Sequence, residues 1–269
     1  YACHIIALNM QNDTFFGKII RMKEEEVISY TRKREFPPFK MTKEVKNECE
    51  LVTVEGDMLR KFNAALERGL FAIAPCGSIF TTNKEGVVAK VEKNVFFKRK
   101  EVKGMKKKWG LKAKECTGAE RDKCLEKKMQ AHSLQLALKI MMNAFFGILS
   151  VPYSRYFNVH IAEAITAGGR HTIKSGQRFC NDLLNNPSED LLAIFAGDGK
   201  KNEDRKDYVC YIDTDSLFVK LGEWIHDQGF GDDWAKIDDE EKIEWIKKIS
   251  ACMENYIDGR IFNETQLQD

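Results

Sequence analysis

The sequence lacks several features that would assign it to a class at once. None of its eight cysteines belongs to a C-x-x-C pair, and the closest two, Cys116 and Cys124, do not have the spacing of a zinc site. It has only five prolines, no internal repeat, and no run of about 18 apolar residues that would predict a membrane span. These absences favour a folded intracellular protein with reduced thiols and no place in a membrane.

The chain of 269 residues can bury a sizeable core, as one large domain or as two smaller ones. It does not begin with methionine, and its first residues lack the basic region of a signal peptide. We therefore expect a piece of a longer intracellular protein.

The net charge of +2 conceals one strongly basic segment. Residues 84–114 hold 12 Lys or Arg against three Glu, a net of +9, whereas the segment 232–245 is acidic. A basic element between neutral and acidic ones suggests a surface that meets a polyanion. The alternative is a solvated, lysine-rich helix face.

The hydrophobic pattern predicts a mixed α+β fold in which a helical hairpin is inserted. Pro37 and Pro38 interrupt any periodic pattern, and Gly110 and Gly118 are expected to end helices. The expected elements are a loop (34–48), a helix (56–69), strand–turn–strand (70–86), two long helices (87–109 and 119–147), a helix (159–185), strands (190–197 and 207–212) and a last helix (238–258).

The second long helix carries one stripe of chemically unlike side chains. Lys139, Asn143 and Phe146 follow at i, i+4 and i+7, which places a cation, an amide and an aromatic ring on one face. Gly147 adjoins them and would let a base or another backbone come close. Singly, a surface lysine and a core phenylalanine would explain these residues, so the combination is what indicates a site.

The first long helix offers cations at the matching height. Arg99 and Lys103 are four residues apart and share a face, where they repel each other unless an anion lies opposite. Residues 99 and 139 are equidistant from residue 119, so in two regular antiparallel helices they lie level, roughly 30 Å from the tip. Three cations near the hairpin base would suit a triphosphate, with arginine making forked contacts.

The stretch YIDTDSLFV (211–219) holds two carboxylates in an apolar, strand-like run. Asp213 and Asp215 are two residues apart, so in an extended chain they point to the same side. Two like charges held so close require a cation between them. A calcium loop does not fit, because the glycine and the later acidic ligands of that motif are missing.

Together these motifs resemble the palm and fingers of a family B DNA polymerase. YIDTDS (211–216) is similar to the family's Y-G-D-T-D-S motif, with Ile212 for glycine. KIMMNAFFG (139–147) is similar to K-x-x-x-N-S-x-Y-G, with Ala144 and Phe146 for Ser and Tyr. YACHIIALNMQNDT (1–14) resembles the end of S-L-Y-P-S-I-I and the N-x-S-P-E-T that follows it.

The resemblance implies template-directed DNA synthesis by two-metal-ion catalysis with Mg²⁺, or with Mn²⁺ as an alternative. Asp213 and Asp215 match the catalytic metal ligands of the family. The implied nucleotide-binding residues are Arg99, Lys103 and Lys139 for the triphosphate, Asn143, Phe146 and Gly147 over the nascent base pair, and Tyr1 under the sugar.

The resemblance also implies a division into a first palm part (1–83), the fingers hairpin (84–147) and a second palm part (148–269). The family's other catalytic Asp would precede residue 1, and no exonuclease domain or thumb matches this chain. We therefore expect a partial catalytic core that shows little or no catalysis alone. The substitutions favour a phage or other viral source, which would mean host cytoplasm, nucleus or virus factory.

The implied partners are primer–template DNA and dNTPs, with a sliding clamp or a complementary polymerase chain as further candidates. Two other hypotheses stay open at this point. A nucleotidyl or glycosyl transferase could use an Asp-x-Asp pair but would not need the Lys139–Asn143–Phe146 stripe. A catalytically inactive palm could serve as a scaffold or as the nucleic-acid-binding piece of a split polymerase.

Overall fold

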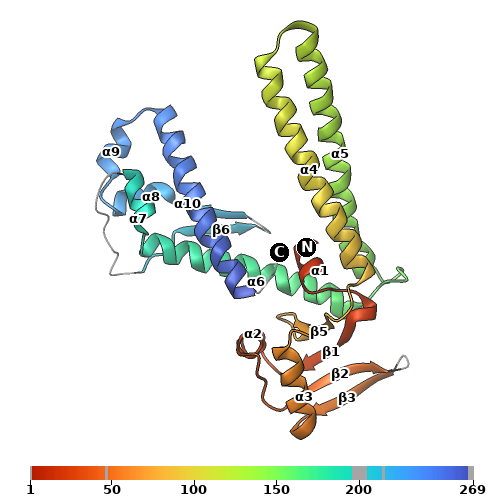
Figure 1. Ribbon diagram of the computed structural model, residues 1–269. Coiled ribbons are helices and arrows are strands. Elements are labelled where there is room, and N and C mark those ends of the chain that lie inside the picture. The colour runs from red at the N-terminus through yellow and green to blue at the C-terminus, as the bar shows by residue number, and fades with distance from the viewer. Residues whose placement is uncertain (1, 46–47, 196–204, 214–215, 266–269) are drawn as a thin grey trace. The chain divides into compact units, whose positions relative to one another are not determined.

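The computed structural model describes residues 2–45, 48–195, 205–213 and 216–265, and it forms two compact units (Figure 1). The first unit covers Tyr1–Gly168 and the second Gly169–Asp269. Helices and an antiparallel sheet in one chain confirm the expected α+β class. The division into palm and fingers parts at 83 and 147 stays a prediction.

A five-stranded antiparallel sheet is the base of the first unit. Its strand order is β3-β2-β1-β5-β4, and two helices, α2 and α3, lie in the connections between its strands. The strands are β1 (Phe15–Ile20), β2 (Phe39–Val45), β3 (Glu48–Val54), β4 (Phe71–Ile73) and β5 (Ser78–Thr81), and the helices are α2 (Glu24–Lys33) and α3 (Gly56–Glu67).

The prediction of a loop over 34–48 is wrong for residues 39–45, because β2 occupies them. Phe39 and Met41 are buried at alternate positions, which is the period of a half-buried strand. Pro37 and Pro38 precede the strand and do not interrupt it. The rings of Phe39 and Phe62 lie 5.1 Å apart, centroid to centroid, so the strand is fixed by an aromatic core.

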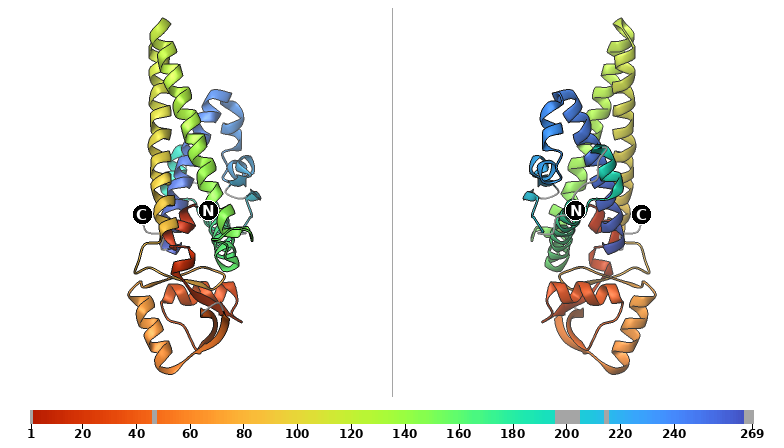
Figure 2. Two further views of the ribbon diagram at one scale, coloured as in Figure 1. Left: turned by 90° about the vertical axis from the view of Figure 1, so that its right-hand side faces the viewer. Right: turned by 90° about the vertical axis from the view of Figure 1, so that its left-hand side faces the viewer.

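The expected helical hairpin is present and is longer than its sequence pattern indicates. Helices α4 (Val87–Glu115) and α5 (Gly118–Ser150) lie side by side, and Cys116 and Thr117 join them (Figures 1 and 2). Gly110 does not end α4, contrary to the prediction. A glycine inside a helix costs only about 1 kcal/mol, and the aliphatic end of Lys128 packs within 3.6 Å of the position where a Cβ of Gly110 would lie.

The two helices meet along a seam of buried and half-buried side chains spaced alternately three and four residues apart. That spacing is the signature of a coiled coil. Unusually for a seam, it includes charged residues, of which Glu92 and Arg99 lie nearest the base. The α4 members are Glu92, Val95, Arg99, Val102, Lys106, Trp109 and Ala113, and the α5 members are Cys124, Lys128, Ala131, Gln135, Leu138, Met142, Phe145 and Leu149.

A second core joins the foot of the hairpin to the rest of the first unit. It contains Ile5 of α1 (Ala2–Ala7), Phe80 of β5, Leu149 of α5 and Ile161 of α6 (Val159–Asn185), all fully or almost fully buried. The prediction of a helix over 159–185 is confirmed. A short 3-10 helix, η1 (Asn12–Thr14), links α1 to β1.

The second unit packs helices around a two-stranded antiparallel sheet of β6 and β7. Its core includes Trp224, whose indole N–H donates to the carbonyl oxygen of Leu184 at 2.8 Å. The elements are α7 (Glu189–Leu192), η2 (Ala193–Phe195), β6 (Val209–Asp213), β7 (Ser216–Val219), α8 (Leu221–Asp227), α9 (Gly231–Lys236) and α10 (Asp239–Thr265).

The prediction of a strand over 190–197 is wrong where the structure describes this range, because α7 and η2 occupy it. Ser188 caps α7 by accepting the backbone N–H of Leu191, and Glu189 and Asp190 occupy the first turn. This is the chemistry of a helix N-terminus. The predictions of a strand near 207–212 and of a last helix are confirmed by β6 and α10.

Among the described helices, α5 is long and apolar enough to cross a membrane by length and composition alone, contrary to the expectation that no segment qualifies. Only 11% of its most apolar window is buried. One such helix is weak evidence for a membrane span, and α5 packs along the charged helix α4 within the hairpin.

Candidate nucleotide-binding site

The register of the hairpin follows from contacts between its two helices. The side chain of Lys128 packs at Gly110, and the Lys127 ammonium lies 4.4 Å from the centroid of the Trp109 ring. Eleven residues toward the base of the hairpin, Gly110 is followed by Arg99 on α4 and Lys128 is followed by Lys139 on α5. Eleven residues are about three full helical turns on either helix, so Arg99 and Lys139 lie at the same height along the hairpin.

The three cations of the predicted site differ in exposure. Arg99 is a half-buried seam residue, whereas Lys103, one turn nearer the tip, and Lys139 are exposed. The Arg99 Nε atom is buried and has no hydrogen-bond partner among the described residues. Within that part of the chain, none of the three forms an ion pair. The hairpin base therefore presents positive charge that its own carboxylates do not neutralise.

The rest of the predicted stripe on α5 divides into exposed and packed members. Asn143 is exposed, and a Cβ added at Gly147 would meet no atom of another described segment within 4 Å. Phe146 is half-buried and packs against the core that contains Ile5 and Leu149. Thus Asn143 and Gly147 present open surface beside Lys139, while the ring of Phe146 is anchored in the core.

The acidic motif lies in the second unit. Asp213 ends β6, is exposed and pairs across the hairpin with Ser216, the first residue of β7. Asp215 and Tyr1 lie outside the described residues. Asp213 supplies the hard oxygen donor that magnesium prefers, but no group of three His, Cys, Asp or Glu that could hold a metal forms among the described residues.

The sequence alone does not predict two features of the hairpin base. Asn9 and Gln11 make hydrogen bonds to the segment that leads into α4; their only sequence signal is the resemblance of residues 9–14 to a family motif. Glu92 is fully buried in the seam, and neither carboxylate oxygen has a hydrogen-bond partner among the described residues. Burial raises its pKa from 4.5 to about 7.

The class of protein follows from comparison of the sequence with known families. The family model of DNA polymerase family B matches residues 42–230. The chain belongs to this family.

Three curated relatives match the chain over half or more of its residues. It is 30% identical over 134 residues to the DNA polymerase alpha catalytic subunit of Drosophila melanogaster, which covers 50% of this chain and 7% of that relative. It is 28% identical over 166 residues to the DNA polymerase delta catalytic subunit of Caenorhabditis elegans, covering 61% and 13%. It is 27% identical over 169 residues to the Drosophila melanogaster DNA polymerase zeta catalytic subunit, covering 62% and 6%. The chain thus spans less than a seventh of the length of each of these relatives.

Proposed function

We propose that the protein, in its natural full length, adds deoxynucleotides from dNTPs to a primer 3′-hydroxyl under the direction of a DNA template, and that this chain is part of the catalytic core. Membership of DNA polymerase family B supports the reaction class. The observation that carries the proposal within this chain is the hairpin register, by which Arg99 and Lys139 lie level, with no carboxylate partner among the described residues.

The role of the cations follows from their geometry. Arg99 is half-buried, so its guanidinium is held by the seam and presents a preorganised fork to phosphate oxygens. Lys103 and Lys139 are exposed, and they contribute mobile point charges to the rest of the triphosphate. Together they neutralise the nucleotide's charge before it reaches the primer end.

Asp213 and Asp215 are the proposed ligands of two magnesium ions. When bound, such ions supply an activated primer hydroxyl and neutralise the leaving pyrophosphate. Asp213 stands at the end of β6, exposed, where its carboxylate is directed by a strand and not by a long flexible loop. Among the described residues, the chain contributes the carboxylate of Asp213 as an oxygen donor at this position.

The exposed stripe beside Lys139 is proposed to face the nascent base pair. Asn143 offers an amide, Gly147 leaves room for the pair, and the anchored ring of Phe146 limits where it can sit. Tyr1 is proposed to lie under the sugar. In these terms residues 84–147 are the fingers, and residues 1–83 and 148–269 are palm.

Primer–template DNA and dNTPs are the proposed partners, and a sliding clamp or complementary polymerase chain would act on the full-length protein. The alternative is a catalytically inactive palm and fingers scaffold, or the nucleic-acid-binding piece of a split polymerase. A viral source and an intracellular site of action remain part of the proposal.

Lys139→Ala tests the proposal in the natural full-length protein. It should raise the KM for dNTPs about 10- to 100-fold, since a hydrogen bond to a charged group contributes about 1.5–3 kcal/mol. Affinity for primer–template DNA should stay within about twofold. Lys123→Ala, which removes an exposed lysine from the tip half of the same helix, is the matched control and should leave the KM unchanged.

Primer-extension kinetics at varied dNTP concentration would measure the KM, and fluorescence anisotropy with labelled primer–template would measure DNA affinity. If Lys139→Ala weakens DNA binding and leaves the KM for dNTPs unchanged, Lys139 belongs to the DNA track. The proposal that Lys139 binds the triphosphate would then be wrong.

A further inference from the structure

The start of helix α4 is held by an amide side chain far away in the sequence. The Asn9 Nδ2 group donates to the carbonyl oxygens of Thr81 at 2.9 Å and Lys84 at 2.8 Å. Its Oδ1 accepts the backbone N–H of Gly86 at 2.7 Å. Asn9 is 7% exposed, so both of its donor hydrogens and its acceptor are used inside the protein.

A second amide caps the helix itself. Gly86 is the N-cap of α4 and has no side chain with which to satisfy the free N–H groups of the first turn. The Gln11 Oε1 atom accepts one of them, the N–H of Val88, at 2.9 Å. Gln11 therefore does the work of a capping side chain from another segment of the chain.

Gly86 is required by space and not by backbone geometry. Its φ of −70° is open to any residue. A Cβ at this position would lie 2.4 Å from Cδ and 2.6 Å from Oε1 of Gln11, far inside van der Waals contact. A side chain at residue 86 would displace the amide of Gln11 and break the hydrogen bond to Val88.

Thr14 holds the backbone that carries both amides. The Thr14 hydroxyl donates to the carbonyl oxygen of Asn9 and accepts the backbone N–H of Gln11 at 3.2 Å. Asn9 has a φ of 51°, a left-handed conformation that asparagine tolerates better than most residues. Asn9, Gln11 and Thr14 are buried and joined by these hydrogen bonds, so the backbone that carries the two amides is held in place.

We propose that Asn9 and Gln11 are positioning residues for nucleotide binding, because they set the direction in which α4 leaves the sheet of the first unit. This inference rests on the proposed function. Arg99 lies thirteen residues along α4 from Gly86, about 20 Å at 1.5 Å per residue. We call the hydrogen bonds of Asn9 and Gln11 to the start of α4 the clamp. If α4 tilts by about 10° at the clamp, Arg99 moves by about 3 Å, and displacements of about 1 Å can cost a hundredfold in rate.

The opposing explanation is that the two amides only stabilise the fold. A matched control separates the two. The Asn63 amide is also partly buried and makes two hydrogen bonds, donating to the carbonyl oxygen of Phe36 and accepting its N–H, both at 3.0 Å. It joins α3 to the loop before β2, away from the hairpin, so Asn63→Asp removes a comparable amide without touching α4.

The experiment compares Gln11→Met with Asn63→Asp in the natural full-length protein, with urea midpoint, DNA affinity and dNTP kinetics measured for each. Gln11→Met keeps the length of the side chain and loses the acceptor for Val88. We expect it to lower kcat/KM for dNTPs about tenfold or more, with DNA affinity unchanged. Asn63→Asp should change kcat/KM less than threefold at an equal or larger loss of stability.

Equal effects of Gln11→Met and Asn63→Asp on kcat/KM would overturn the positioning role while leaving the polymerase activity itself intact. A wild-type protein that extends no primer would refute the proposed function, and this inference with it. Amide hydrogen exchange on the chain of 269 residues tests the clamp without any activity. Residues 86–91 should exchange faster in Gln11→Met than in wild type, and unchanged exchange would refute the cap.

Gly86→Ala supplies a second, independent variant. It should reproduce the kinetic loss of Gln11→Met, because the added methyl group displaces the same amide. In a Gln11→Ala background the methyl group meets no amide, so the double variant should lose little more than Gln11→Ala alone. Fully additive losses would show that the two residues do not share this contact.

Discussion

Replacing Glu92 by glutamine should stabilise the first unit at alkaline pH and leave its stability almost unchanged at acidic pH. Glu92 is fully buried in the seam of the hairpin, and its carboxylate oxygens have no hydrogen-bond partner among the described residues. Desolvation on burial raises its pKa from 4.5 to about 7. Glutamine has the shape of the protonated acid and cannot ionise.

The size and sign of the effect follow from linkage. Below pH 4.5 the carboxyl is protonated in both folded and unfolded chains and imposes no ionisation penalty. As pH rises from 4.5 to about 7, the unfolded chain releases its proton more readily than the folded one, so the folded state loses stability. Above that range the loss is complete at about 3 kcal/mol, and Glu92→Gln should recover it.

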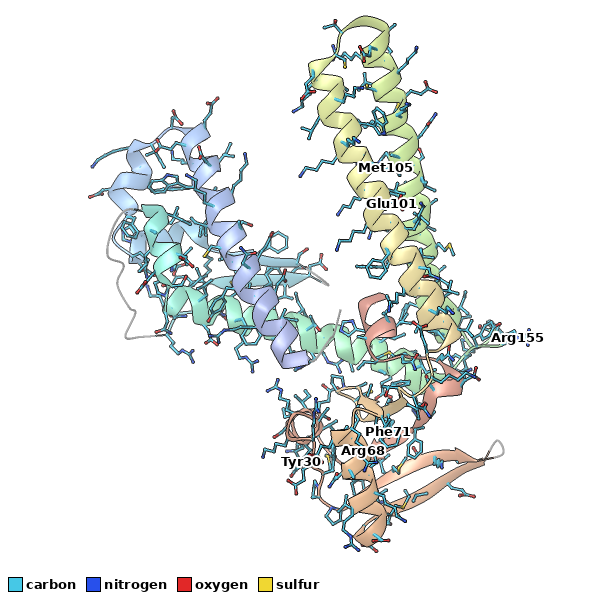
Figure 3. All side chains as sticks on the ribbon, in the orientation of Figure 1. Tyr30, Arg68, Phe71, Glu101, Met105 and Arg155 are labelled. Atoms are coloured by element: carbon cyan, nitrogen blue, oxygen red, sulfur yellow. The ribbon has the colours of Figure 1, made fainter. Side chains whose placement is uncertain are left out.

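Urea denaturation followed by circular dichroism, on the purified chain at pH 4.5 and pH 8, measures the difference. Glu101→Gln is the matched control, because Glu101 lies exposed on the same helix (Figure 3) and, among the described residues, forms an ion pair with Lys98 alone. It should change stability by less than about 0.5 kcal/mol at both pH values. If Glu92→Gln destabilises the protein at pH 8, Glu92 is ionised and paired in solution and the argument fails.

Other predictions concern the hairpin base, the second unit and DNA binding. Gly147→Ala should preserve helix stability or raise it by up to about 1 kcal/mol, because a Cβ there meets no atom of another described segment within 4 Å. Nucleotide incorporation should nevertheless fall, and thermal melting with primer extension would check both. Asp227→Asn should destabilise the second unit by about 1–2 kcal/mol at pH 7, since it replaces the carboxylate that accepts from Lys206 and Tyr208 with a neutral amide that has one acceptor oxygen. Those hydrogen bonds, that of Lys206 first, lower the pKa of Asp227 below its ordinary 3.8. Its contribution is therefore present above pH 3.8 and lost below it, and denaturation as a function of pH would show a constant difference instead if this is wrong. Affinity of the full-length protein for primer–template should fall steeply and linearly with the logarithm of salt concentration; anisotropy titrations that show no salt dependence would count against phosphate contacts.

The long helices could be predicted from sequence because their apolar periodicity extends over many turns. Single residues that usually end helices or strands gave wrong predictions where tertiary packing outweighs their local preference. Gly110 lies within α4, since the partner helix holds it in place, and Pro37 and Pro38 lead into β2 where a loop was expected. The apolar run at 190–195 is helical because Ser188 caps it.

The candidate site could be predicted in part for a geometric reason. Two regular helices with a short connection fix their own register, so the level of Arg99 and Lys139 follows from counting residues, and the contacts at Gly110 agree with it. The clamp could not be predicted. It joins Asn9 and Gln11 to residues more than seventy positions away, and no local pattern encodes such a pairing. The buried state of Glu92 likewise depends on which face of α4 becomes the seam.

The most direct test of the central claim is single-nucleotide primer extension by the natural full-length protein with Mg²⁺, run beside Asp215→Asn and beside this chain alone. The account predicts that the wild-type protein adds only the nucleotide that the template specifies. Asp215→Asn should bind primer–template and add none, and the chain alone should add little or none. A wild-type protein that binds primer–template yet adds no nucleotide with Mg²⁺ or Mn²⁺ would contradict the account and leave an inactive scaffold.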